Sequence, residues 1–357
     1  MIERNLYHKK LTEAIEGLNE ANLPSHVGNC TQPSYVNEQY YDEVFKKDKY
    51  NQLTGEDRKK KKYEHEYTGK KVIIMICSKC NEYCKQCYIS YNGNRKPKEL
   101  VELVGNLKDK YQIELNGSEV LTDLEYLKAF KIVGQQSIES NGKAIIDNPK
   151  TIEVLKENNI NSIALSYNFE IQNSLSSITI EELDKIINLL QKNNIEVGLI
   201  TTITSKNYNQ IEEMCKKAQD MGAKGIKFNN LVAQGKNFDL YNYLLNEEEE
   251  KEFFEQLSKV REEYDKDTLL IERCGTFGKN LCVAKSNFKC ICGINQVVLT
   301  PNNRLYPCIY LAKTGYEIGK YEKGKLMVSG TFEVKTDNCL VDEVCNKTLL
   351  YKRKTVE

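Results

Sequence analysis

The chain has 357 residues, and its 51 Lys and Arg residues balance 51 Asp and Glu residues. This zero net charge gives no basic field for nucleic acid, and no apolar run approaches the roughly 20 residues that span a membrane. The charged N-terminal segment lacks the apolar centre of a signal peptide, so we expect a cytoplasmic protein. In a reducing cytoplasm, 13 cysteines favour metal binding or catalysis over a disulfide framework.

Residues 1–70 are expected to form a polar N-terminal extension with some helix, because apolar side chains follow helical spacing near its start. The basic run at 57–62 is typical of a solvated helix face, and binding of an acidic partner is the alternative.

Residues 71–245 alternate apolar, strand-like runs with amphipathic helices. We predict strands over 72–76, 113–115, 162–166, 196–201 and 225–229. Thr179 and Glu182 form a capping-box pattern at the start of one helix, and Gly222 suits the end of the next. About six strand–helix units indicate an α/β fold with a parallel sheet, namely a partial (β/α)6 TIM-like barrel.

Residues 246–357 begin with an acidic helix from Glu247 to about Lys266 and then change character. Seven of the 13 cysteines lie in 267–357, together with the hairpin-like segment VVLTPNNRLYPC. We therefore predict a linker helix followed by a small C-terminal cysteine-rich domain.

Three cysteines stand close together in CNEYCKQCY, residues 80–88, shortly after the first predicted strand. Two zinc knuckles need a long spacer between two CxxC pairs, and only three residues separate Cys80 from Cys84. The CxxxCxxC spacing that ends at Cys87 suits a loop around three irons of a [4Fe–4S] cluster, with the fourth iron open to a ligand. A zinc site, or loop thiols without metal, are the alternatives. Cys77 lies outside this spacing and is expected to face the barrel wall.

A strand followed by this motif and Tyr88, on a partial barrel, resembles the radical S-adenosylmethionine (radical SAM) enzymes. The variant CNEYCKQCY is similar to their peptide- and protein-modifying branch, and the resemblance covers residues 71 to about 235. It implies that Cys80, Cys84 and Cys87 hold a cluster whose open iron chelates the amino and carboxylate groups of S-adenosylmethionine. One-electron transfer then cleaves the cofactor to a 5′-deoxyadenosyl radical, which abstracts a hydrogen atom.

Six further residues match the family's cofactor-binding positions. They are Asn116, Gly117, Ser118, Glu119, Ser166 and Asn168. The first four stand where the family has Gly-Gly-Glu-Pro, so the resemblance implies that this turn and its carboxylate hold the cofactor's ammonium. The last two end a strand where the family binds the ribose or carboxylate, and an ordinary polar strand end is the alternative. At the last strand, Asn229, Asn230 and Gln234 are candidates for binding substrate backbone or adenine.

The C-terminal cysteines resemble the auxiliary-cluster SPASM/Twitch extension of radical SAM enzymes. The run CICG at 290–293 and the hairpin that returns to a cysteine match its opening pattern. The chain has too few cysteines for two auxiliary clusters, so the resemblance implies one further [4Fe–4S] cluster. Its expected ligands are Cys290, Cys308, Cys339 and Cys345. Cys292 competes with Cys290 for its place, and a four-thiolate zinc site is the alternative.

The stretches IELNGSEVLTDLEYLKAF and GIKFNNLVAQG resemble the radical SAM peptide epimerases of ribosomal-peptide biosynthesis. That resemblance implies abstraction of a Cα hydrogen from a ribosomal precursor peptide and hydrogen return from a thiol on the opposite face. Cys282, in a Gly-rich loop, is the candidate donor, with a buried thiol or a cluster ligand as the alternative. An external reductant of the flavodoxin or ferredoxin type would supply electrons.

Three other functions stay open at this point. A peptide maturase that forms thioether or carbon–carbon crosslinks would remove two hydrogens from its product. A radical SAM dehydrogenase would act on a small molecule or a protein side chain. A non-catalytic iron–sulfur electron carrier is disfavoured by the barrel and by the three-ligand motif. We expect neither a nucleic-acid nor a membrane partner.

Overall fold

The computed structural model of the protein describes residues 35–37, 65–232, 243–264, 268–273, 288–290, 293, 295–312 and 316–328. Its strands are β1 (Tyr35–Asn37), β2 (His65–Glu66), β3 (Lys71–Met75), β4 (Gln112–Asn116), β5 (Ser137–Ser140), β6 (Ser162–Ser166), β7 (Glu196–Ile203), β8 (Gly225–Asn230), β9 (Leu270–Arg273), β10 (Phe288–Cys290), β11 (Gln296–Leu299), β12 (Arg304–Tyr306), β13 (Gly319–Glu322) and β14 (Lys325–Val328). Its α-helices are α4 (Pro97–Leu107), α5 (Leu127–Val133), α6 (Lys143–Asp147), α7 (Thr151–Glu157), α8 (Gln172–Leu175), α9 (Ile180–Lys192), α10 (Ile211–Asp220) and α11 (Glu247–Glu263).

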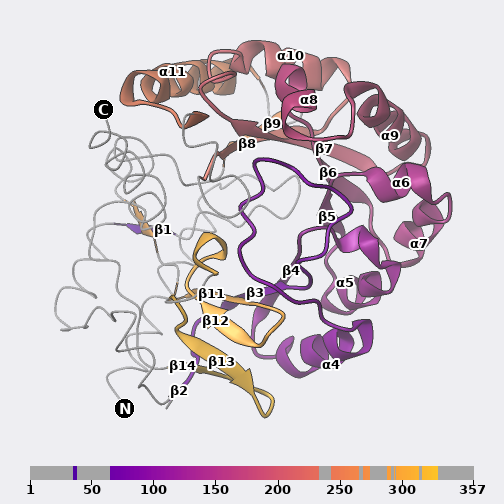
Figure 1. The fold of residues 1–357 in the computed structure, drawn as a ribbon, viewed down its shortest axis with the longest axis vertical. Helices are drawn as coiled ribbons and strands as arrows, with labels where there is room; N and C mark the ends of the chain where they lie inside the picture. The colour runs from indigo at the N-terminus through magenta and orange to yellow at the C-terminus, as the bar shows by residue number, and fades with distance from the viewer. Residues whose placement is uncertain are drawn as a thin grey trace.

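Parallel strands form a curved wall with helices outside it (Figure 1). Strands β5, β6, β7, β8 and β9 pair in that order, and every pair is parallel. Strands β3 and β4 form a second parallel pair. The strand–helix alternation therefore builds the predicted α/β partial barrel, and β9 extends it beyond the six expected units.

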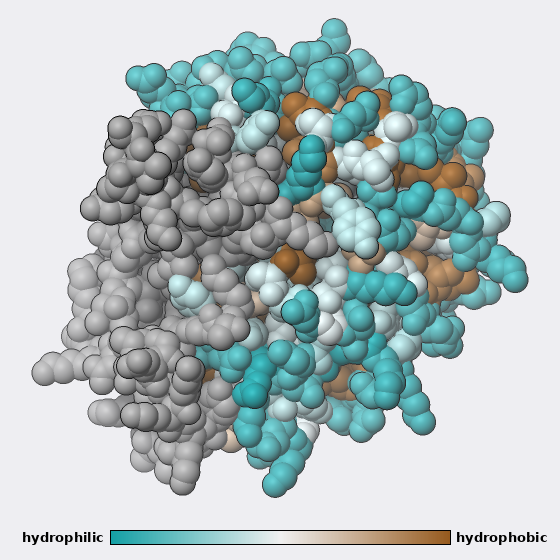
Figure 2. All heavy atoms as spheres, in the orientation of Figure 1, coloured by the Kyte–Doolittle hydropathy of each residue, from teal (hydrophilic) through white to brown (hydrophobic). Residues whose placement is uncertain are grey.

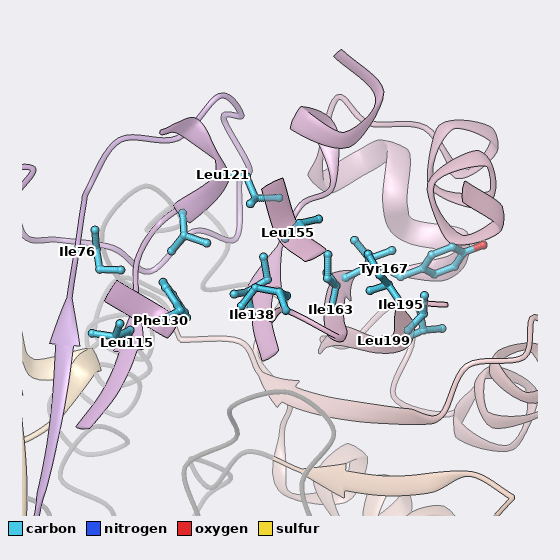
Figure 3. Packing of buried hydrophobic residues seen from close by; sticks show 14 of the residues in the cluster. Ile76, Leu115, Leu121, Phe130, Ile138, Leu155, Ile163, Tyr167, Ile195 and Leu199 are labelled. Carbon is cyan, nitrogen blue, oxygen red and sulfur yellow. The ribbon is translucent and has the colours of Figure 1, made fainter. Parts of the chain in front are cut away.

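Local sequence signals explain the helices that cover this wall. Thr179 caps α9 through the backbone N–H of Glu182, whose carboxylate accepts from the N–H of Thr179 in return. Helix α10 ends just before Gly222, whose φ of +70° is the left-handed conformation expected after a helix. The buried faces of both helices pack on apolar strand residues, and Figure 3 shows part of this core, including Ile138, Ile163 and Leu199.

A side chain takes the place of strand pairing between β4 and β5, which belong to different sheets. Gln135 accepts a hydrogen bond from the Leu115 N–H at 2.7 Å. Its amide nitrogen donates to the carbonyls of Leu115 and Ser137 at 2.9 and 3.1 Å. One glutamine amide thus supplies the donor and acceptor that a neighbouring strand would supply, and it joins the two halves of the wall.

The C-terminal segment adds strands to the same wall. Strand β11 pairs parallel with β3, and β12, β13 and β14 follow as an antiparallel meander. The predicted hairpin is β11 to β12, and Asn303 in its turn has a φ of +61°, as a residue replacing glycine must. Strand β14 also pairs with β2, and β1 pairs with β10. The proposed domain boundaries at residues 70 and 245 stay predictions.

The outer surface of the curved wall is formed by its helices (Figure 1) and is mostly hydrophilic. Figure 2 shows mostly hydrophilic side chains along the outer rim of the part drawn in colour. Among the described residues, no helix is long and apolar enough to cross a membrane.

Candidate active site

A cavity of about 370 Å³ lies at the carboxyl ends of the barrel strands. The loop between β3 and α4 contributes many of its walls, and in Figure 1 this indigo loop passes over the open centre of the wall. The strands β4, β5, β6, β7 and β8 contribute residues at or near their carboxyl ends. This is the end of a parallel barrel where side chains from several strands meet, and its volume lies in the range of small-molecule sites.

The three cysteines of the CxxxCxxC motif all line this cavity. Cys80, Cys84 and Cys87 are half-buried. Burial, followed by the nearby charges of Cys80 and Cys87, raises the pKa of the Cys84 thiol to about 12. In the described ranges, no three His, Cys, Asp or Glu side chains converge on a single metal ion. A [4Fe–4S] cubane does not need three ligands on one metal ion, because each thiolate binds a different iron. Three thiols around one cavity therefore fit such a cluster.

The motif loop is anchored on one side by a buried carboxylate. Glu82, between the first two cysteines, is 4% exposed and accepts from the Ser177 hydroxyl at 2.8 Å and the Ser177 N–H at 3.2 Å. The Lys85 N–H donates to the Leu175 carbonyl at 2.9 Å. The last residue of α8 and the segment after it therefore hold the loop at two points.

The other side of the loop rests on the C-terminal strands. The rings of Tyr88 and Tyr310 lie 4.6 Å apart between centroids. Tyr91 is buried and its hydroxyl donates to the Cys77 carbonyl at 3.2 Å. Farther along, the Arg95 guanidinium donates to the Thr300 carbonyl at 2.6 Å. The hairpin β11–β12 and the residues after it thus form part of the support for the cysteine loop.

Cys77 is fully buried and does not line the cavity, as expected for a residue outside the motif. Its Sγ approaches the carbonyls of Lys79 and Glu119 at 3.7 and 3.6 Å. Burial raises its pKa. A Cβ built on Gly117 would lie 3.1 Å from this sulfur, so a side chain there would require the sulfur or the turn to shift by a few tenths of an ångström.

Five of the six residues predicted to bind cofactor line the cavity: Asn116, Gly117, Ser118, Ser166 and Asn168. Asn168 is also structural, since its Oδ1 accepts from the Thr202 N–H at 2.9 Å and its amide donates to Gln172 at 3.1 Å. Phe169, directly after it, has a φ of +47°, which is strained for a bulky residue. The role of these residues in binding S-adenosylmethionine stays a prediction.

Glu119, the sixth, lies outside the cavity lining and is 1% exposed. Its carboxylate accepts from the backbone N–H groups of Leu121 and Asn141 at 3.0 and 2.8 Å and from the Ser140 hydroxyl at 3.0 Å. Burial raises its pKa, and these hydrogen bonds oppose the rise. In this structure the carboxylate organises the turn after β5, and its contact with the cofactor stays a prediction.

The cavity also contains polar atoms that suit a polar ligand. The Oδ1 of Asn229 is buried without a hydrogen-bond partner among the described residues. Glu139 lines the cavity and pairs with Lys227 from β8 at 3.0 Å. An unsatisfied buried acceptor and a charged lining match a zwitterionic cofactor better than an apolar one.

Comparison with known proteins begins with the sequence. No protein-family model matches the chain. The uncharacterised protein MJ0907 of Methanocaldococcus jannaschii is 28% identical over 207 residues, which are 50% of this chain and 70% of that protein. AlbA of Bacillus subtilis, an antilisterial bacteriocin subtilosin biosynthesis protein, is 25% identical over 258 residues. These residues are 67% of this chain and 54% of AlbA, so the chain spans about half the length of that relative.

Solved structures share the fold. Streptococcus suis SuiB bound to S-adenosylmethionine has a TM-score of 0.57 at 14% identity, covering 79% of this chain and 68% of SuiB. SuiB bound to its precursor peptide SuiA has a TM-score of 0.58 at 15% identity, covering 98% and 79%. The protein anSMEcpe with bound S-adenosylmethionine has a TM-score of 0.54 at 18% identity, covering 71% and 77%.

The fold of this chain resembles that of SuiB and anSMEcpe, both of which were solved with bound S-adenosylmethionine.

The predicted auxiliary site is described only in part. Cys308 is half-buried and packs against the cluster of Val232, Tyr310 and Leu311, beside the cavity. For Cys290 the structure describes only its backbone, in β10, opposite Tyr35. Cys274, Cys282, Cys292, Cys339, Cys345 and Gln234 lie outside the described residues. The ligand set of a second cluster therefore stays a prediction.

Several residues that line the cavity were not predicted from the sequence. Glu139, Ser140 and Asn141 all come from the end of β5. The segment Ser137–Ser140 contains a single apolar residue, Ile138, so its sequence has no apolar run that would indicate a strand. The only available signal was the unexplained length of chain between the second and third predicted strands.

Proposed function

We propose that the chain is a radical SAM enzyme that modifies a ribosomally made peptide. The observation that carries this proposal is the cavity at the carboxyl ends of the barrel strands, which Cys80, Cys84 and Cys87 all line. An enzyme that used the three thiols only to carry electrons would need no polar ligand cavity beside them. The cavity therefore favours catalysis over an electron-carrier role.

The comparisons support a peptide substrate. AlbA is named for biosynthesis of a bacteriocin, SuiB has been solved with the precursor peptide SuiA, and anSMEcpe with the peptides Cp18Cys and Kp18Cys. A ribosomal precursor peptide is accordingly the substrate class we propose for this chain.

We assign three roles to the residues of the cavity, namely cluster binding, cofactor contact and exclusion of water. Cys80, Cys84 and Cys87 would each hold one iron of a [4Fe–4S] cluster, and the turn around Gly117 would lie against the cofactor. When bound, the cluster and S-adenosylmethionine supply a carbon-centred radical that takes a hydrogen atom from the substrate. Tyr310, packed on Tyr88 and next to Val232, forms an apolar wall that excludes water from the reacting atoms.

The finer proposal is epimerisation of an L- to a D-residue. Inversion at Cα needs hydrogen removal on one face and hydrogen return on the other, so two groups are required. We assign the return to the thiol of Cys282, which lies outside the described residues. Its S–H hydrogen goes to the Cα radical, and one electron from an external flavodoxin- or ferredoxin-type reductant, with a proton, restores the thiol. A second [4Fe–4S] cluster on the C-terminal cysteines completes the proposed cofactor set.

The test uses a candidate precursor peptide incubated with enzyme, S-adenosylmethionine and reductant in deuterated water. An epimerase yields a D-residue with one deuterium at Cα and no other mass change. Cys282→Ala should retain cofactor cleavage and lose the D-product, while Cys215→Ala, which removes a buried thiol on α10, should retain both. Unchanged epimerisation by Cys282→Ala excludes it as donor.

A crosslinking maturase is the second candidate, favoured by the likeness to AlbA and SuiB, both linked by name to peptide products or precursors. Its product would be lighter by two hydrogens and would carry no deuterium at Cα. Absence of any peptide modification would instead favour a dehydrogenase of small molecules or protein side chains.

A further inference from the structure

Asn141 directly follows β5 and its side chain reaches the cysteine loop. It is 9% exposed, and its amide nitrogen lies 3.6 Å from the Sγ of Cys80 and 2.8 Å from the Oδ1 of Asn81. The amide oxygen accepts from the Lys143 N–H at 2.9 Å. Because a backbone N–H fixes which end of the amide is oxygen, the NH2 group must face the loop, with one hydrogen available for each partner.

The turn that presents Asn141 is held from several directions. The buried carboxylate of Glu119 accepts from the Asn141 N–H at 2.8 Å and from the Ser140 hydroxyl. The Ser140 hydroxyl in turn accepts from the Gly142 N–H at 2.9 Å. Gly142 has a φ of +82°, and a Cβ there would lie 2.9 Å from Ile186. A side chain presented by so constrained a turn can hold an ångström-level contact with a neighbouring sulfur.

We propose that Asn141 is a positioning residue that donates an N–H···S hydrogen bond to Cys80 and thereby raises the reduction potential of the catalytic cluster. This rests on the proposed function, which places a cluster at Cys80, Cys84 and Cys87. Hydrogen bonds to ligand sulfurs are among the factors that set the potentials of iron–sulfur clusters. The reduced cluster carries one more electron than the oxidised cluster, so a donor beside a ligand sulfur stabilises the reduced form more.

Two features of the contact set make this assignment specific. Glu82, the buried acid near the loop, is turned toward Ser176 and Ser177 and places its negative charge on the opposite side. Asn141 thus places a neutral N–H donor at Cys80, while the hydrogen bonds of Glu82 hold its carboxylate at residues 176 and 177.

Three variants separate the possibilities. Asn141→Ala removes the N–H without adding charge. Asn141→Asp keeps an oxygen for the Lys143 N–H, so it preserves the turn, removes the donor and adds a negative charge beside Cys80. Asn81→Ala removes the second partner of the Asn141 amide and leaves the N–H···S contact intact, which makes it the matched control.

The readout is the midpoint potential of the reconstituted protein in a redox titration followed by electron paramagnetic resonance. The catalytic signal is the one that the Cys80/Cys84/Cys87→Ala triple variant lacks. At a fixed poise, the ratio of reduced to oxidised cluster should fall about three- to tenfold in Asn141→Ala, the effect of one hydrogen bond, and further in Asn141→Asp. Asn81→Ala should stay within about twofold of wild type.

Two results would overturn the proposal. One is an unchanged potential in both Asn141 variants at normal iron content and normal thermal unfolding. The other is an equal shift in Asn81→Ala, which would make loop position rather than the N–H···S bond responsible. A wild-type protein without any signal that depends on the three cysteines would instead refute the proposed function, so the two failures are distinguishable.

Discussion

The Arg95 guanidinium donates to the carbonyl of Thr300 at 2.6 Å, although the two residues lie 205 positions apart. Its other terminal nitrogen donates to the Asn303 side chain at 2.8 Å. Arg95 is 7% exposed, and its own carbonyl accepts from the Tyr126 hydroxyl at 2.7 Å. A single buried cation therefore ties the end of the cysteine-bearing loop to the turn of the C-terminal hairpin.

Replacing Arg95 by Ala should lower the free energy of unfolding by about 3 kcal/mol, because two hydrogen bonds from a charged donor are lost and the buried Thr300 carbonyl loses this donor. Urea denaturation of the purified protein measures this. Arg304→Ala is the control, since Arg304 is 43% exposed and pairs with Glu317 at 3.6 Å. Its loss should cost at most about 1 kcal/mol, as for other surface pairs. Equal effects of the two substitutions would contradict the prediction.

The iron content tests the cluster assignment. Anaerobically reconstituted protein should bind about eight irons, four for each of two cubanes. Changing Cys80, Cys84 and Cys87 together to Ala should remove about half of that iron and abolish cleavage of S-adenosylmethionine. Colorimetric iron analysis and quantification of 5′-deoxyadenosine decide the outcome. Continued 5′-deoxyadenosine production by the triple variant would show that the catalytic cluster lies elsewhere.

The close approach of Gly117 to Cys77 predicts an interaction between two substitutions. Gly117→Ala places a methyl group 3.1 Å from the Cys77 sulfur and should weaken S-adenosylmethionine binding by about tenfold, since the turn must move. Adding Cys77→Ala removes the sulfur and should restore part of the affinity. Cys77→Ser alone should keep cofactor cleavage within a few-fold of wild type. Calorimetric affinities of the single and double variants, combined in a cycle, test this, and strict additivity would argue against it.

The Gln135 bridge predicts that a single side chain holds the wall together. Gln135→Leu should lower the free energy of unfolding by about 2 kcal/mol, because the N–H and C=O of Leu115 lose their partner. Gln136→Leu is the matched control on the neighbouring exposed residue, whose side chain accepts only from Asn161. Its effect should be within about 0.5 kcal/mol. Comparable losses in both variants would mean that the bridge is dispensable.

The buried carboxylate of Glu119 predicts a pH dependence of stability. Burial raises its pKa above the usual value of 4.5, so the folded state binds a proton more readily than the unfolded state. The stabilisation by this proton is complete below pH 4.5 and is lost as the pH rises through the raised pKa. The difference in unfolding free energy between wild type and Glu119→Gln should therefore decline with rising pH. Urea midpoints at a series of pH values from 5 to 8 provide the measurement, and a difference that grows with pH would refute it.

Local signals predicted much of the barrel. The strands at Lys71–Met75, Ser162–Ser166 and Gly225–Asn230 coincide with apolar runs. Both hydrogen bonds of the capping box join Thr179 and Glu182, which are three residues apart. These features depend on side chains that are close in sequence, so they can be recognised from the sequence alone. The same holds for the left-handed Asn303 in the hairpin turn.

Features that depend on distant contacts were not predictable. Ser140 looks like a loop residue until the buried Glu119 is known to lie beside it, and this contact explains why a polar segment forms strand β5. The contacts of the Glu119 carboxylate with residues 140 and 141 also have no local signature, and its predicted role toward the cofactor stays a prediction. The parallel pairing of β11 with β3 likewise has no local signature.

That pairing sets an order of events during synthesis. Lys70 and Asn295, next to the two strands, are 225 residues apart, so one edge of β3 has no partner until the ribosome has made most of the chain. At 5–20 residues per second this takes roughly 10 to 45 s. Throughout that time the apolar strand Lys71–Met75 offers unpaired backbone groups to any extended segment nearby. A nascent or truncated chain that stops before residue 296 should therefore depend on chaperones, and its self-association should begin at this strand.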